Sequence, residues 1–134
     1  MADEAYAANC RLIFSFLWGV RYLYPGHMIL INVKFTPLSD NVETFPELVR
    51  DFTQATRAED GCLFFEWYRS TERPNEYILV EGFKDDAAEA HVGSEHFKAA
   101  CELFPTILEK TPEIINTLIE GKTHWDEMAE FQVQ

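Results

Sequence analysis

The chain has 134 residues, of which 47% are hydrophobic and 14% aromatic, so its length and composition indicate one globular domain with a sizeable core. Its 11 basic and 23 acidic residues give a formal net charge of −12. This charge argues against nucleic acid and anionic membranes as partners, because both are bound by basic surfaces. A small neutral or weakly acidic molecule remains as the expected ligand.

The first 27 residues differ in character from the rest of the chain. An apolar run over residues 12–20 is far shorter than the roughly 20 residues that cross a bilayer. Acidic residues precede this run and no small-residue cleavage site follows it, so the pattern is not that of a secretory signal. We expect residues 1–27 to be an extension before a domain at residues 28–121, with a tail at residues 122–134. Three widely spaced cysteines indicate free thiols in a cytoplasmic protein and no metal cluster.

The domain is expected to begin with a strand and a helix. Residues 28–35 are rich in β-branched and apolar side chains and predict the first strand, with Asn32 on its less apolar face. The helix that follows begins at Thr44 or at Asp40, since each has a glutamate three residues later, as in a capping box. It should end before Gly61, because glycine commonly follows the last turn of a helix.

Two further strands are predicted at residues 62–69 and 76–83, joined by a polar turn. The first of them carries large apolar side chains on both faces, which is typical of a central strand that is covered on both sides. Glu66 is then a carboxylate among aromatic side chains, and it should be paired or altered in its ionisation. Trp67 points to the opposite face, where we expect it to pack at a subunit interface.

The second half of the domain is expected to contain two short helices and a last strand. Asp85 or Asp86 should cap the first helix, and Ser94 should cap the second after a glycine break. Residues 106–110, between two prolines, are expected to be irregular or to form a short helical piece. Alternating apolar residues then predict a strand at residues 113–119.

The order of these elements, β-α-β-β-α-α-β, predicts an α+β fold: a ferredoxin-like antiparallel sheet with helices on one face. Helices on one face leave the other face of an aromatic-rich sheet bare, and soluble monomers rarely expose an apolar surface of that size. We therefore expect a homodimer in which two sheets pack face to face as a dimeric α+β barrel.

Residues 28–121 resemble the antibiotic biosynthesis monooxygenase domain, a family within the dimeric α+β barrel superfamily. The resemblance lies in the turn at residues 58–63, in Glu66 with residues 68–70, in residues 75–81, and in the motif His91-x-x-Ser94-x-His96-Phe97. It implies a small pocket between the sheet and the helices of each subunit. It also implies a cofactor-independent monooxygenase that oxidises a small quinol-like or polyphenolic compound with molecular oxygen, without a metal.

The resemblance also suggests roles for particular side chains. His91 or His96, which we favour equally, would be the base or a hydrogen-bond donor, since imidazole changes its charge near neutral pH. Asn32 would bind the substrate oxygen or the peroxide formed from it, and Glu66 would orient a histidine. The side chains expected to pack against the aromatic ring of the substrate are Tyr68, Phe83 and Phe97, with contact to the substrate as the alternative to the interface for Trp67.

Other readings of the sequence stay open. A heme-degrading branch of the superfamily resembles residues 94–100 and Asn32, but His91 and Cys101 stand where that branch has a tryptophan and the axial histidine. A branch that isomerises or cleaves small carbonyl signalling compounds also has a histidine at the helix junction. A ligand-binding dimer without turnover is the third alternative. Oxygen uptake would separate the monooxygenase from the last two.

Overall fold

A computed structural model describes residues 26–134. The extension predicted at residues 1–27 therefore lies almost entirely outside the described residues. In chain order the elements are β1 (Met28–Phe35), η2 (Ser39–Asn41), α2 (Phe45–Leu48), α3 (Arg50–Arg57), β2 (Cys62–Arg69), β3 (Tyr77–Lys84), α4 (Ala88–Val92), α5 (Glu95–Ile107) and β4 (Glu113–Ile119). No helix within residues 26–134 is long and apolar enough to cross a membrane.

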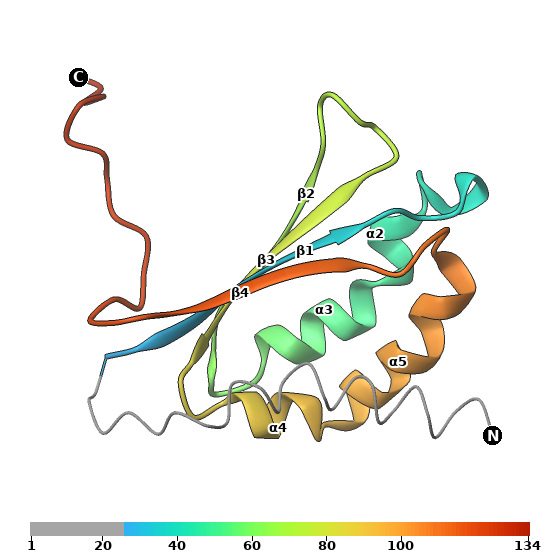
Figure 1. Ribbon diagram of the computed structural model, residues 1–134, viewed down its shortest axis with the longest axis horizontal. Helices are drawn as coiled ribbons and strands as arrows, with labels where there is room; N and C mark the ends of the chain where they lie inside the picture. The colour runs from blue at the N-terminus through green and yellow to red at the C-terminus, as the bar shows by residue number, and fades with distance from the viewer. Residues whose placement is uncertain (1–25) are drawn as a thin grey trace.

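The four strands form one antiparallel sheet in the order β2-β3-β1-β4, and the helices pack on one face of it (Figure 1). This is the ferredoxin-like α+β fold that the order of the predicted elements indicated. The central strands β1 and β3 place alternate residues between sheet and helices, where Ile31 and Phe83 are fully buried. The core is therefore a single apolar layer between the sheet and the four helices.

The helix boundaries follow local sequence signals in part. Pro46 lies in the first turn of α2, where its missing N–H costs little, although the predicted single helix is divided at Val49. Ser94 caps α5 as predicted, because its Oγ accepts a hydrogen bond from the backbone N–H of Phe97 at 3.2 Å. One prediction was wrong. Neither Asp85 nor Asp86 caps α4, whose N-cap residue is Ala87.

At its end, α5 continues through Pro105 to Ile107, so the start of the segment at residues 106–110 takes the helical form, one of the two that were expected. Pro105 removes one helical hydrogen bond and should disfavour the last turn. That turn is held from outside, because the carbonyl of Ile107 accepts hydrogen bonds from the backbone N–H of Leu38 at 2.9 Å and from the Asn41 side chain. Tertiary contacts therefore stabilise a helical end that local sequence opposes.

The two faces of β2 differ from the expectation. Phe65 and Trp67 point toward the helices, where the Trp67 Nε1–H donates to Thr53 Oγ1 at 2.8 Å. The prediction that Trp67 packs at a subunit interface was therefore wrong, since alternation places it in the core of its own subunit. An irregularity between Cys62 and Phe64 shifts the register of the strand.

The opposite face of the sheet carries no helix within the described residues (Figure 1). Tyr68 is 54% exposed there, Ile115 is 76% exposed, and Phe64 has its ring centroid 5.7 Å from that of Trp125 in the C-terminal segment. We call this surface the open sheet face. Its apolar character agrees with the reason for expecting a dimer, while the dimer itself stays a prediction.

Candidate functional site

A cavity of about 170 Å³ lies between the sheet and the helices. Its walls are mostly apolar, with Val33 and Leu79 from the sheet and Phe52, Phe97 and Phe104 from α3 and α5. Glu81 from β3, His91 from α4 and the thiol of Cys101 from α5 also line it. An apolar cavity with a few convergent polar groups is the usual form of a small-molecule site.

Glu81 is a carboxylic acid in the middle of the core. Its residue is 5% exposed, and its strand neighbours Ile31 and Phe65 are both 0% exposed. Burial raises the pKa of Glu81 to about 8, and the negative charge of Glu59 adds to the shift. At neutral pH this side chain is therefore mostly a neutral acid, which can donate a proton or a hydrogen bond into the cavity.

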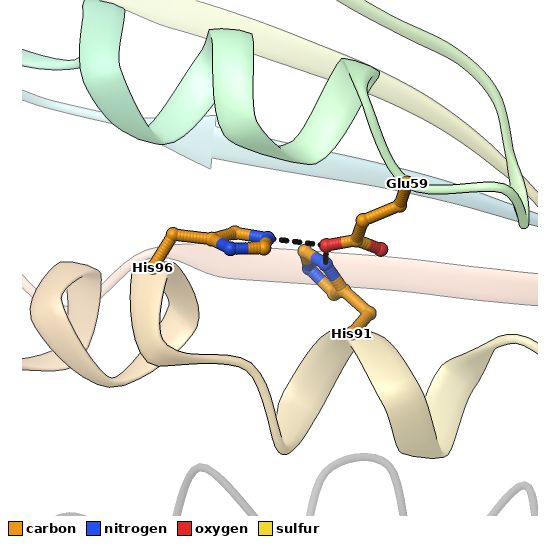
Figure 2. A group of neighbouring side chains, drawn as sticks. All are labelled: Glu59, His91 and His96. Atoms are coloured by element: carbon orange, nitrogen blue, oxygen red, sulfur yellow. Dashed lines mark hydrogen bonds and ion pairs between the residues drawn. The ribbon is translucent and has the colours of Figure 1, made fainter.

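A cluster of Glu59, His91 and His96 lies at one side of this cavity (Figure 2). One oxygen of Glu59, Oε1, is hydrogen bonded to Nδ1 of His91 at 2.8 Å and also to Nε2 of His96. Partial burial is the largest single influence on Glu59 and raises its pKa, but the hydrogen bonds and electrostatic attraction of the two histidines together outweigh it, so the pKa of Glu59 lies below its ordinary value. An ionised carboxylate only accepts hydrogen bonds. Nδ1 of His91 and Nε2 of His96 must therefore each carry a hydrogen and donate it to Glu59.

The helix junction and a glycine bring the cluster together. Gly93 ends α4 and Ser94 begins α5, which turns the two imidazoles toward the same oxygen (Figure 2). Glu59 belongs to the turn after α3, and Gly61 allows that turn to lie against α4. A Cβ atom at Gly61 would approach Cβ of Ala87 to 2.1 Å, which no real contact allows.

Aromatic side chains fix the two imidazole rings. The His91 ring lies 4.7 Å from Phe83 and 5.1 Å from Phe97, measured between ring centroids. Phe52 lies against both histidines, at 6.1 Å from His91 and 6.3 Å from His96. His91 is therefore almost completely enclosed, and the side chain of His96 is 23% exposed.

The same three residues are the set within residues 26–134 that could hold a metal ion, since their ligand atoms lie within 4.8 Å of one another. Ligand atoms around a tetrahedral zinc ion are about 3.3 Å apart, given bonds of about 2.0 Å. The Glu59–His91 distance of 2.8 Å is shorter than that and fits a direct hydrogen bond. The geometry is therefore that of a hydrogen-bonded cluster.

The structure brings together part of the predicted site. His91 and His96 share the cluster, and Phe83 and Phe97 pack against His91. Trp67 lies on the same side of the sheet, where its ring packs at 5.0 Å from Phe35.

Three other predicted residues are on the open sheet face, because alternation along β1 and β2 turns them away from the cavity: Asn32, Glu66 and Tyr68. Glu66 pairs with Arg57 at 3.2 Å, so the expectation that Glu66 orients a histidine was wrong. The carboxylate that holds the histidines is Glu59.

Sequence reasoning missed Glu59 and did not select Glu81. Glu81 could have been found, because strand alternation places it on the same face as Tyr77, Leu79 and Phe83, and a carboxylate on an apolar face is exceptional. Glu59 gave no such signal. It stands in a polar turn beside Asp60, and charged turn residues are usually solvated.

Comparison with known proteins shows which family has this sequence pattern and fold. The family model for antibiotic biosynthesis monooxygenase matches residues 28–103. An uncharacterized protein of Synechocystis is 30% identical over 84 residues, which is 62% of this chain and 56% of that protein. The chain therefore spans little more than half the length of that curated relative.

Solved structures agree with the family model. A conserved protein from Methanosarcina mazei has a TM-score of 0.62 at 27% identity, over 67% of this chain and 90% of that one. A crystal structure of antibiotic biosynthesis monooxygenase has a TM-score of 0.60 at 19% identity, over 66% of this chain and 95% of that one. At that identity the second likeness concerns the fold alone. With a family model that matches more than half of its length and this fold, the chain belongs to the antibiotic biosynthesis monooxygenase family.

Proposed function

We propose that this protein is a cofactor-independent monooxygenase that oxidises a small phenol or quinol with molecular oxygen. The observation that carries the proposal is that His91 and Glu81 line one apolar cavity. Membership of the family supports a reaction of the monooxygenase type. The substrate and the oxygen chemistry are part of the proposal.

The cavity suits a small aromatic substrate. A cavity of about 150 Å³ can hold benzene, so a volume of about 170 Å³ fits one ring with short substituents. Phe97 and Phe104 would offer flat surfaces against which such a ring packs. A second fused ring would require movement of the wall side chains, so we expect one-ring substrates to be oxidised faster than naphthalene-based ones.

The two ionisable groups supply opposite functions. His91 would accept the hydroxyl proton of the substrate at Nε2, the ring nitrogen that Glu59 does not hold. The resulting anion is a strong enough reductant to pass an electron to oxygen, and one oxygen atom then bonds to a ring carbon. Glu81, held mostly in its protonated form, would donate to the second oxygen atom as the O–O bond breaks.

This reaction balances without a further reductant. A phenol and one molecule of oxygen give a quinone and one water. The hydroxyl proton and the proton on the oxygenated ring carbon are the two hydrogens of that water. The apolar walls exclude bulk water, so that the reactive anion forms only inside the cavity.

An isomerase or lyase for a small carbonyl compound is the second candidate. The same pair of His91 and Glu81 could move a proton between two carbon atoms without oxygen, because a base and a neutral acid share the cavity. Product formed under nitrogen at an unchanged rate would favour this candidate over the monooxygenase.

Oxygen uptake with a reduced one-ring quinol or a phenol tests the proposal. We expect uptake above the rate without protein, and a decrease of at least about 100-fold in kcat for His91→Asn, since general base catalysis is worth that much. The matched control is His124→Asn, because His124 is exposed and outside the cluster. Uptake that is equal in the two variants would remove His91 from the mechanism.

We also propose that a second copy of the chain covers the open sheet face. The large apolar side chains exposed on that face and in the adjoining segment support this: Tyr68, Ile115, Trp125, Met128 and Phe131. Trp125 already packs on Phe64 at the edge of the same surface. A second sheet would remove these side chains from water, as the residues of the core are removed.

A further inference from the structure

We propose that Glu59 and His96 form the proton exit of the cavity: a proton taken up by His91 inside is balanced by a proton that His96 releases to water. The use of this exit in catalysis depends on the proposed function. The electrostatic coupling of the two histidines through Glu59 does not depend on it.

The geometry gives the path its direction. Exposure of the side chains increases along the cluster, from 1% for His91 to 15% for Glu59 and 23% for His96. His91 lines the cavity, while His96 belongs to the first turn of α5 and is partly open to solvent. Figure 2 shows both rings directed at the same oxygen of Glu59, from two successive helices.

The charges explain why uptake and release should be linked. One oxygen of Glu59 is hydrogen bonded to both rings, and a single negative charge balances one imidazolium but not two. In the proposed exchange the positive charge of the resting cluster lies on His96, whose side chain is the more exposed of the two rings. When His91 gains the substrate proton at Nε2, His96 loses its Nδ1 proton to water. When that proton later leaves His91 for the product water, His96 takes a proton back from solvent, so no proton is lost over the cycle. The total charge of the three side chains stays the same, so no charge is added to a partly buried site.

Two ionisable groups beside the cluster have raised pKa values, Glu81 on β3 and Cys62 on β2. Burial raises the pKa of Cys62 to about 11, and the charge of Glu59 contributes to that shift. Because Glu59 is hydrogen bonded to both rings, removal of one ring should change the proton affinity of the other.

Rescue of His96→Asn by a small diffusible base tests the exit. In dilute buffer we expect kcat to fall about tenfold while KM stays the same, because proton release becomes slow and substrate contacts are intact. Added imidazole should restore the rate, since it can accept the proton in place of His96. His124→Asn should show neither effect. A full rate in dilute buffer, or a loss that imidazole does not reverse, would overturn the proposal.

A measurement independent of turnover tests the coupling itself. Nuclear magnetic resonance of labelled histidine rings should show that proton uptake by His91 moves to higher pH in His96→Asn, where the competing imidazolium is gone. It should move to lower pH in Glu59→Gln, where the shared charge is gone. An unchanged His91 titration in both variants would overturn the coupling. Coupled histidines in a protein that consumes no oxygen would instead contradict the proposed function alone.

Discussion

Replacement of Glu81 by glutamine should stabilise the protein above pH 5. Glutamine has nearly the same shape as a protonated glutamic acid, but it cannot ionise. In the wild-type protein the pKa of Glu81 is about 8 when folded and close to 4.5 when unfolded. Between these values the folded state keeps a proton that the unfolded state has released, so the free energy of unfolding falls as the pH rises.

The size of the effect follows from the pKa difference. Each pH unit in this window costs about 1.4 kcal/mol, so the wild-type protein should lose about 3 kcal/mol between pH 5 and pH 8 through Glu81. The stabilising contribution of this group is fully present below about pH 4.5 and is lost as the pH passes through about 8. Glu81→Gln should therefore gain little at pH 5 and about 3 kcal/mol at pH 8.

Urea unfolding at pH 5, 6, 7 and 8 measures this difference. The matched control is Glu66→Gln, because Glu66 lies on the exposed side of the sheet in a pair with Arg57 and should leave the pH dependence unchanged. The reasoning would be refuted if the free-energy difference between Glu81→Gln and the wild-type protein did not grow with pH.

Three further predictions concern the glycine at the cluster, the open sheet face and the half-buried thiol of Cys62. Gly61→Ala should lower the free energy of unfolding, measured by urea unfolding, by about 1–3 kcal/mol, because its new Cβ overlaps Ala87. The control Asp60→Ala should not, because Asp60 is exposed. Equal stability of the two variants would contradict the packing of this turn against α4. Ile115→Lys should convert a dimer into a folded monomer, as measured by light scattering, because it puts a charge on the open sheet face. Lys122→Ala is the control. A stable dimer of Ile115→Lys would place the interface elsewhere. Cys62 should react with a disulfide reagent at pH 8 far more slowly than a free cysteine does, because its pKa of about 11 leaves little thiolate; a rate equal to that of free cysteine would contradict its burial.

Periodicity predicted most of the fold. The strand at residues 28–35 and the one at 62–69 have the predicted bounds, since alternating apolar residues define a strand over its whole length. The helix cap at Ser94 was also predictable, because a serine directly after a glycine break is a local sequence signal for the start of a helix. The end of α5 was not, as contacts with Leu38 and Asn41, more than 60 positions earlier, stabilise a turn that Pro105 disfavours.

The candidate site was predicted less completely. The two histidines could be selected from their residue type and spacing, but alternation does not say which face of β2 meets the helices. Glu66 was therefore assigned to the face with the histidines, and Trp67 to the other. Glu59 meets His91 across 32 positions of sequence, in a contact that depends on how the turn after α3 packs against α4. Such a contact follows from packing and has no local signal.

Mass spectrometry of the product formed under ¹⁸O₂ tests the central claim most directly, with a phenol as substrate and His91→Asn as the comparison. We expect the wild-type protein to give a quinone that carries one ¹⁸O atom per molecule, and His91→Asn to give little product above the protein-free reaction. Unlabelled quinone accompanied by hydrogen peroxide, or labelled quinone at the same rate from both proteins, would contradict the account.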